Sequence, residues 1–183
     1  MGVTARGLGA GDLPAWETVA GEQAPTGTPY AAVSQHTRAL AAAFAAEGAP
    51  VLVAVDATGV GAAVVEELRR DPGPAEVLGV TAHAGARVSG VWPDLGVPKG
   101  ALVGEFNQAA RGERFVVDPM LPAAGVLRVQ LKAYVEKRAA SGRVRFEAAR
   151  ERDHDDMVSA AQLAVYAGAY WWEICRQRVP GRG

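Results

Sequence analysis

Two groups of acidic residues have the types and positions that metal chemistry needs. Asp56 directly follows the apolar run VLVAV at 51–55, and the run DHDD occupies 153–156 at the start of a long apolar pattern. Packed aspartates repel one another, and a divalent cation such as Mg²⁺ or Mn²⁺ removes that repulsion because it prefers carboxylate oxygens as ligands. Each group also has a structural explanation, Asp56 as a turn aspartate and the acidic run as the first turn of a helix. The residues alone leave both interpretations open.

Basic side chains accompany both acidic groups. Lys99 in VPKG stands at the head of an expected helix, and four arginines flank the acidic run, namely Arg143, Arg145, Arg150 and Arg152. Lysines and arginines in such places hold the phosphates of a DNA backbone. A solvated surface lysine and an exposed strand edge of mixed charge explain the same residues.

The glycines after Asp56 offer a competing interpretation. The segment GVGAAV at 59–64 follows an expected strand and opens an expected helix, as a nucleotide-binding loop would. The acid that binds the ribose should follow about 20 residues later, where TAH stands at 81–83 instead. Asp56 would also meet a pyrophosphate with like charge. A nucleotide-binding α/β protein that uses Gly59 and Gly61 is therefore the least favoured hypothesis.

Alternating helical and strand patterns must position these residues. Thr28 and Pro29 predict a helix start, a capping hydroxyl followed by proline at the first helical position, and Gly48 predicts the helix end. The apolar run at 51–55 predicts a central strand that is covered on both faces. The alternation predicts an α/β sheet with at least some parallel pairing. In chain order, the expected elements are a helix over 29–47, a strand over 51–55, a helix over 60–70 and a strand over 76–82.

The rest of the chain is less regular. Residues 83–98 are glycine-rich and predict a long irregular loop. Residues 1–14 lack periodicity and are expected to form a mobile leader, followed by a short strand or strand remnant at 16–19. The domain boundaries that we expect are a leader at 1–14, one domain at 15–175 and a tail at 176–183. The later elements that we expect are a helix over 99–111, a strand over 114–118, a helix over 123–140, a strand over 143–148 and a helix over 154–172.

Composition narrows the class of protein. A chain of 183 residues is long enough for one domain with a buried core. A net charge of −1 counts against a protein that coats DNA, but it is compatible with a nuclease whose acidic centre offsets a local basic rim. The single cysteine, Cys175, cannot form an intramolecular disulfide, and no apolar run reaches the length of a membrane span. We expect a reducing, intracellular setting.

Several segments resemble the nuclease domain of phage terminase large subunits. GTPYAAV at 27–33 is similar to the opening of that domain's first helix, and VAVDATGVGAAVVEELR at 53–69 resembles its strand, loop and helix with the second catalytic acid. VPKGALV at 97–103 is similar to its lysine-bearing helix start. RDHDDMVSAAQLA at 152–164 resembles its final helix, whose aspartates supply the last acid. The segments follow the family's order and together cover about 27–172.

The resemblance implies a fold and a chemistry. The fold would be RNase H-like, an α/β mixed sheet flanked by helices. The chemistry would be two-metal phosphodiester hydrolysis with Mg²⁺ or Mn²⁺, with Asp56 binding one metal and Asp155 or Asp156 completing the site. His154 would orient a carboxylate or contact a phosphate. The residues implied to contact DNA are Lys99, Arg143, Arg145, Arg152 and His154.

The resemblance also implies a biological setting. A terminase nuclease cuts concatemeric double-stranded DNA during genome packaging, in the cytoplasm of the bacterial host. Its partners would be the terminase ATPase domain, the small subunit or the portal, and no membrane. A non-catalytic module that docks to DNA or to the packaging machinery on the same scaffold is the alternative.

One departure from the family bears on activity. The family's domain begins with a central strand that carries the first catalytic aspartate, and no segment before Thr28 has that pattern. No phosphate-binding lysine loop of an ATPase domain is present either. The sequence therefore predicts a fragment, a mis-started reading frame or a degenerate prophage relic, with its N-terminal strand missing. Both an active nuclease and an inactive scaffold remain open at this point.

Overall fold

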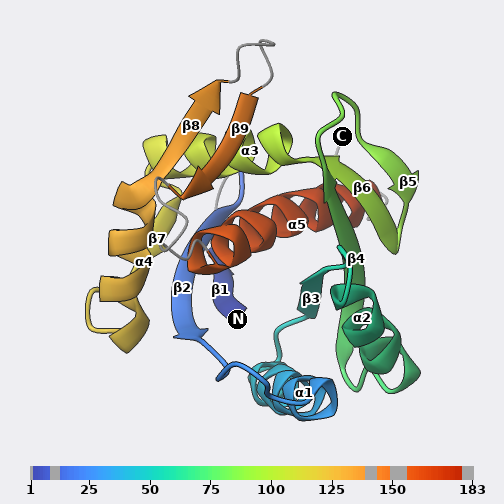
Figure 1. The fold of residues 1–183 in the computed structure, drawn as a ribbon. Helices are drawn as coiled ribbons and strands as arrows, with labels where there is room; N and C mark the ends of the chain where they lie inside the picture. Colours follow the sequence, from blue (N-terminus) through green and yellow to red (C-terminus); the bar gives the residue numbers. More distant parts are fainter. Residues whose placement is uncertain (1, 9–12, 139–143, 149–155, 179–183) are drawn as a thin grey trace. The chain divides into compact units, whose positions relative to one another are not determined.

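The computed structural model describes residues 2–8, 13–138, 144–148 and 156–178. The chain divides into two compact units. Unit 1 comprises Met1–Gln23 and Gly100–Gly183, and unit 2 comprises Ala24–Lys99. Figure 1 labels the helices and strands of both units. None of the helices among the described residues is long and apolar enough to cross a membrane.

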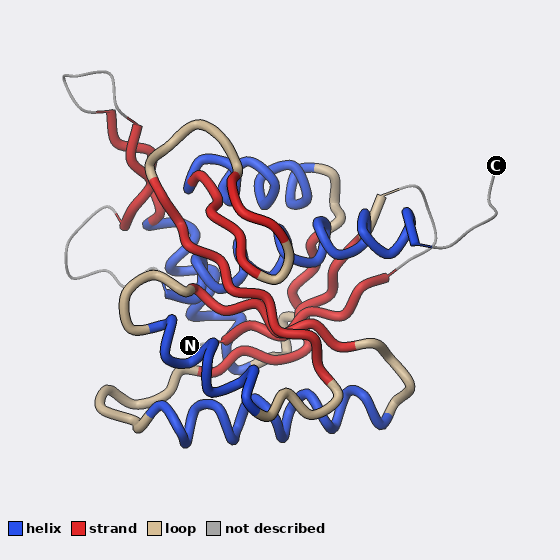
Figure 2. Tube along the Cα trace, turned by 90° about the vertical axis from the view of Figure 1, so that its right-hand side faces the viewer, coloured by secondary structure: helices blue, strands red, loops and turns tan. Residues whose placement is uncertain are grey.

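Unit 2 is built on a four-stranded mixed sheet with the strand order β3-β4-β6-β5. Strands β3 (Val51–Asp56), β4 (Ala75–His83) and β6 (Asp94–Pro98) run parallel, and β5 (Ser89–Val91) pairs antiparallel with β6. Helix α2 (Gly61–Arg70) makes the crossover that joins the parallel strands β3 and β4. Helices and strands alternate over residues 30–83, and β5 and β6 then follow β4 directly. Figure 2 colours helices blue and strands red. The predicted α/β sheet with parallel pairing is confirmed.

Helix α2 covers one face of this sheet. Its buried residues Val65 and Leu68 pack against Val77 of β4, and Val53 and Val55 of β3 are half-buried against the same cluster. Full burial of such a side chain contributes roughly 1.5–3 kcal/mol. The apolar, β-branched residues of β3 and β4 therefore account both for the strands and for the helix that packs on them.

Strand β3 lies at the edge of the sheet. Within the residues that the structure describes, β4 is its one hydrogen-bonded neighbour. The strand predicted from VLVAV is confirmed, but its predicted central place is wrong for this part of the chain. An unbroken apolar run indicates that both faces of a strand are apolar, and it carries no information about backbone pairing at either edge.

Helix α1 spans Tyr30–Ala46 and matches the predicted helix closely. Gly48 follows its end with a φ of 83°, the left-handed conformation expected of a helix-ending glycine. The predicted Thr28 cap is wrong. The hydroxyl of Thr28 donates to the carbonyl of Pro25 at 2.7 Å, and the N-cap residue is Pro29, which has no side-chain hydrogen bond to offer. A local turn before the helix competes successfully for the hydroxyl.

Two arginines fasten helix α2. Arg38 of α1 donates to the backbone carbonyls of Glu67 and Asp71, each at 2.6 Å, which satisfies oxygens that the C-terminus of a helix leaves without partners. Arg69 of α2 meets both carboxylate oxygens of Asp94, at 3.0 and 3.1 Å. A bidentate pair of this kind fixes geometry. It holds the end of α2 at the start of β6.

Residues 83–98 form more structure than the sequence predicted. The expected irregular loop is wrong, because β5 and β6 form an antiparallel hairpin within it. Gly90 has a φ of 79°, and a Cβ there would lie 2.4 Å from the carbonyl oxygen of Asp94. The turn thus requires glycine, and glycine in such short strands conceals the strand pattern from the sequence.

Unit 1 contains a three-stranded sheet in the order β1-β2-β7. Strand β1 (Gly2–Leu8) pairs antiparallel with β2 (Ala15–Glu22), and β7 (Phe115–Val117) pairs parallel with β2. The strand predicted at 16–19 is confirmed. The leader predicted over 1–14 is wrong for Gly2–Leu8, and so is the expectation that no full strand precedes Thr28. Backbone pairing with β2, and not an apolar pattern, defines β1.

Helix α5 (Asp156–Arg178) forms the centre of the unit 1 core. It contacts β1 and α4 (Pro122–Ala133). Gly168 of α5 admits the indole of Trp16, since a Cβ at that position would lie 2.7 Å from the ring. The buried cluster also includes Phe106 of α3 (Lys99–Arg111), the helix whose first residue belongs to unit 2. The full cluster is Trp16, Phe106, Ala109, Leu127, Met157, Val158, Ala161 and Val165.

The helix predicted over 123–140 is correct only in its first part. Helix α4 ends at Ala133, and β8 (Tyr134–Arg138) follows at once and pairs antiparallel with β9 (Val144–Ala148). No glycine or proline marks this change, so hairpin pairing with the next segment of the chain overrides a continuous helical pattern. The other expected elements of this unit, over 99–111, 114–118, 143–148 and 154–172, are confirmed within the described residues.

Replacing Leu127 by alanine tests the packing of α4. Leu127 is 1% exposed in the core cluster, so Leu127→Ala should lower the free energy of unfolding by about 2–5 kcal/mol. Val129 on the same helix is 68% exposed, and Val129→Ala should change it by less than about 0.5 kcal/mol. Chemical denaturation followed by circular dichroism measures both. Equal effects would contradict the packing described.

The phenol of Tyr166 provides a test at alkaline pH. Burial raises its pKa above the ordinary value of 10.0, and Tyr170 and Glu105 raise it further by charge repulsion. A raised pKa means that the folded state favours the neutral phenol. The resulting stabilisation is complete below pH 10.0 and is lost as the pH rises through the pKa of the folded state. Thermal unfolding of the wild type and Tyr166→Phe between pH 9 and 11 should therefore show a smaller alkaline loss of Tm in the variant.

Candidate active site

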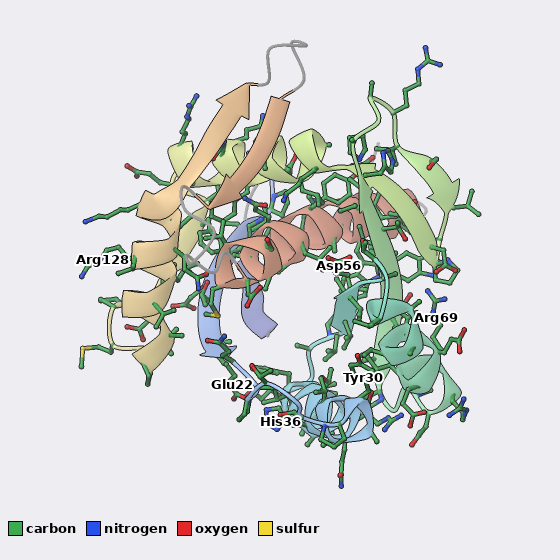
Figure 3. All side chains as sticks on the ribbon, viewed as in Figure 1. Glu22, Tyr30, His36, Asp56, Arg69 and Arg128 are labelled. Atoms are coloured by element: carbon green, nitrogen blue, oxygen red, sulfur yellow. The ribbon has the colours of Figure 1, made fainter. Side chains whose placement is uncertain are left out.

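Asp56 is the last residue of β3 and is labelled in Figure 3. Val53 and Val55 face α2, so the alternation of side chains along a strand places Asp56 on the opposite face of the sheet. Its side chain is exposed. The backbone N–H of Thr58 donates to its Oδ1 at 2.9 Å, whereas its Oδ2 has no hydrogen-bond partner among the described residues. Asp56 thus combines a turn-forming role with a carboxylate oxygen that is free to bind a ligand.

The loop after Asp56 depends on two glycines. Gly59 has a φ of 59°, which favours glycine. A Cβ on Gly61 would lie 1.7 Å from the backbone carbonyl oxygen of Asp56, so only glycine allows α2 to begin this close to the end of β3. These backbone requirements account for both glycines without a nucleotide. β4 ends in His83, so it does not end in the acidic residue that a nucleotide-binding loop would need to bind the ribose.

Lys99 stands at the same edge of the unit 2 sheet as Asp56. It follows β6, and the carboxyl ends of parallel strands share one edge. The register aligns Asp56 with Val80 and Val80 with Leu95. Lys99 therefore lies four residues beyond the level of Asp56, or about 13 Å along the strand direction. It has no ion pair or hydrogen bond within the described part of the chain, so its ammonium is available to an anion.

Asp156 is the first residue of α5 and is exposed. The next backbone N–H, that of Met157, donates to Oε1 of the buried Gln130 at 2.9 Å. Gln130 thus anchors the first turn of α5 to α4. An acidic residue in this first turn suits the helix dipole, so the structural explanation of Asp156 holds whether or not it binds a metal.

The other expected site residues are only partly described. Arg145 lies in β9, opposite Lys137 of β8 in the antiparallel register. Four further residues lie outside the described residues, namely Arg143, Arg152, His154 and Asp155. Asp56 and Lys99 belong to unit 2, and Asp156 belongs to unit 1. Among the residues that the structure describes, no group of three or more His, Cys, Asp or Glu side chains is placed to hold a metal ion.

The donor chemistry of Asp56 fits a hard divalent cation. Its exposed carboxylate offers a free oxygen, the ligand type that Mg²⁺ and Mn²⁺ prefer. Asp156 offers a second exposed carboxylate. Asp56 is therefore chemically able to supply one ligand to such a cation.

His83 is a polar residue at this sheet edge that the sequence analysis did not select. It is the last residue of β4, between the strand that carries Asp56 and the strand that precedes Lys99. The rule that ligands bind at the carboxyl ends of parallel strands applies to β4 as well as to β3. Examining the end of every parallel strand would have identified it.

Replacing Gly61 by alanine tests the close approach of α2 to β3. The new Cβ would meet the carbonyl oxygen of Asp56, so the backbone must shift, and Gly61→Ala should cost about 2 kcal/mol or more of stability. Gly125 in α4 has open space around its Cβ position, and Gly125→Ala should stabilise by up to about 1 kcal/mol through helix propensity. Thermal and urea unfolding compare the two. A Gly61→Ala protein as stable as the wild type would refute the contact.

Comparison with known proteins supplies the fold. No family model and no curated protein matches the sequence. Among solved structures, the chain is similar to the large terminase nuclease from thermophilic phage G20c. The magnesium-bound form of that nuclease has a TM-score of 0.55 and 22% identity over 76% of this chain.

Two further structures of the G20c nuclease give the same result. The cobalt-bound form has a TM-score of 0.58 and 20% identity over 90% of this chain, and another structure has 0.54 and 17% over 91%. The chain spans 62% of the length of the magnesium-bound structure and 79% and 81% of the other two. Similarity at this level shows the fold. The chain therefore has the RNase H-like α/β fold of a phage large terminase nuclease domain.

Proposed function

We propose that this chain is a metal-dependent DNA endonuclease domain of the terminase large-subunit type. The observation that carries the proposal is the place of Asp56 within this fold. It ends a parallel strand at the sheet edge where α/β folds bind ligands, and it keeps a free carboxylate oxygen there. Structures of this fold from phage G20c have been solved with magnesium and with cobalt bound, which supports a divalent cation as the cofactor.

The residues divide into metal ligands and DNA contacts. Asp56 and either Asp155 or Asp156 would hold two Mg²⁺ or Mn²⁺ ions, which supply an activated water and stabilise the leaving oxygen. In the proposed domain, residues 15–175, the basic side chains hold the DNA backbone, because phosphate contacts position a duplex without reading its sequence. These side chains are Lys99, Arg143, Arg145, Arg152 and His154.

The proposed setting is the packaging of phage DNA. The substrate is concatemeric double-stranded DNA in the cytoplasm of the bacterial host. The partners are the terminase ATPase domain, the small subunit or the portal. The similarity to structures named as large terminase nucleases supports this setting.

A non-catalytic docking module is the second candidate. Its support comes from the N-terminal strands. The resemblance implies an aspartate on the first strand, whereas β1 reads GVTARGL and β2 reads AWETVAGE, without an aspartate in either. In this alternative the scaffold binds DNA or the packaging machinery and does not cleave.

Replacing Asp56 by asparagine tests the nuclease. Asparagine keeps an Oδ1 acceptor for the backbone N–H of Thr58 and removes the charge that a metal needs. Asp56→Asn should therefore reduce Mn²⁺-dependent nicking of supercoiled plasmid by about a hundredfold or more, with Tm unchanged. Asp155→Asn and Asp156→Asn, compared in the same assay, identify which acid completes the site.

Glu66→Gln provides the matched control. Glu66 is an exposed acid of α2 in the same unit, and it makes no ion pair within the described residues. This variant should cleave at the wild-type rate. Nicking that survives Asp56→Asn would reject the proposed metal site. DNA binding by the wild type without cleavage at any divalent cation concentration would instead favour the docking module.

A further inference from the structure

We infer that His83 and Lys99 form a phosphate-binding pair that holds the DNA backbone beside the proposed metal site. The inference rests on the proposed function for the identity of the ligand. Two observations carry it, namely the fixed orientation of the His83 imidazole and the register that places Lys99 next to it.

The imidazole of His83 is held in one orientation. The backbone N–H of Gly85 donates to its Nδ1 at 2.9 Å. In the neutral ring the proton is then on Nε2, which becomes a hydrogen-bond donor. Nε2 has no hydrogen-bond partner among the residues that the structure describes. His83 is only half-buried, so this donor is accessible to a ligand.

Two glycines make room for the ring. A Cβ on Gly85 would lie 2.8 Å from Nδ1 of His83, and a Cβ on Gly96 would lie 3.4 Å from its Nε2. Gly96 is on β6, the strand that pairs with β4. The imidazole therefore lies against the backbone of the next strand, and a side chain at Gly85 would displace it.

The register places Lys99 beside His83. His83 pairs with Pro98 in the parallel ladder, and Lys99 is the next residue after Pro98. Neighbouring strands are about 4.8 Å apart, so the backbones that carry these two donors are close. Lys99 makes no ion pair within the described part of the chain. The flexible stem of Lys99 would let its ammonium reach a phosphate oxygen that Nε2 of His83 also binds.

The distance between this pair and Asp56 matches the spacing of phosphates along a DNA strand. Asp56 is level with Val80, three residues before His83, which corresponds to about 10 Å along the strand. Phosphates of one DNA strand are spaced by about 3.4 Å along the helix axis. By alternation, His83 lies on the α2 face and Asp56 on the other, so a backbone that crosses the sheet edge meets both. The pair would thus hold a phosphate about three nucleotides from the one at the metals.

A purely structural role of His83 is the alternative. Asp56 and Asp118 also accept a hydrogen bond from the backbone N–H two residues later, so His83 could serve only to shape the turn to Gly85. Asparagine places an acceptor near the position of Nδ1 and lacks a donor at the position of Nε2. Glutamine places an N–H donor near the position of Nε2 and lacks an acceptor near the position of Nδ1. The two substitutions therefore separate the roles.

The test measures binding of a fluorescein-labelled DNA duplex by anisotropy, in EDTA so that no cleavage occurs. His83→Asn should keep the wild-type Tm and weaken binding about threefold to tenfold. His83→Gln should retain most of the affinity. Lys99→Gln should weaken binding and reduce the slope of log K against log salt by about 0.9, as loss of one phosphate contact requires. The loss in the double variant His83→Asn, Lys99→Gln should differ from the sum of the single losses, because the two donors share one phosphate.

The outcomes separate this inference from the proposed nuclease. Wild-type affinity in His83→Asn overturns the inference. If His83→Gln also has a lower Tm, the histidine serves only to shape the turn. A wild type that fails to bind the duplex also overturns it. Cleavage that depends on Asp56, together with normal binding by His83→Asn, overturns the phosphate pair alone. Binding that depends on His83 in a chain without nuclease activity upholds the pair and rejects the enzyme.

Discussion

The parallel register of β3, β4 and β6 is the constraint on which the candidate site depends. Parallel strands end at a common edge. Here β3 ends in an aspartate, β4 ends in a histidine, and a lysine directly follows β6. Antiparallel pairing of any two of them would separate these side chains by the length of a strand. The βαβ crossover through α2 makes β3 and β4 parallel, and the packing of Val65 and Leu68 on Val77 holds that pair.

Some charged side chains of unit 2 hold the fold together, and others in the candidate site are unpaired within the described residues. Arg38 binds backbone carbonyls at the end of α2, and Arg69 of α2 binds the carboxylate of Asp94. Exposed ion pairs of this kind add little stability, but they fix where α2 ends and where β6 begins. Lys99 and the free oxygen of Asp56 have no such commitment among the described residues. In unit 2, the paired charges of Arg38 and Arg69 thus hold the helix and strand ends in place, whereas Lys99 and Asp56 are able to bind a ligand.

Periodicity predicted most of the helices and the βαβ pattern of unit 2. The helices over 30–46 and 99–111 follow from apolar spacing and from their end signals, Gly48 among them. The failures have a common physical cause. Strands β1, β5 and β6 are rich in glycine and depend on backbone pairing with other segments, and β8 replaces a helical pattern in the same way. Each of these pairings is an antiparallel hairpin between neighbouring strands, and the hydrogen bonds that define it join backbone groups, so side-chain preferences along one segment do not reveal it.

The candidate site shows the same division. Asp56 was predictable because it ends a strand that the sequence marks clearly, and Lys99 because it begins a helix that the sequence marks. Asp156 was predictable from the acidic run. His83 was not selected, because its significance depends on the register between β4 and β6. Sequence spacing identifies residues at strand ends. The hydrogen-bonded register between strands is needed to show which of those ends are neighbours.

Gly61 has a consequence for how this fold can diverge. Identity to the G20c nuclease is only 17–22%, so few positions remain by which sequences can be aligned. Asp56 is expected to be retained if chemistry requires its carboxylate, and Gly61 because a Cβ there would clash with the carbonyl oxygen of that same aspartate. The two residues are therefore expected to keep a constant separation along the chain while the residues between them drift. A carboxylate and a glycine at fixed spacing after an apolar strand would serve as an anchor for aligning distant members of this fold.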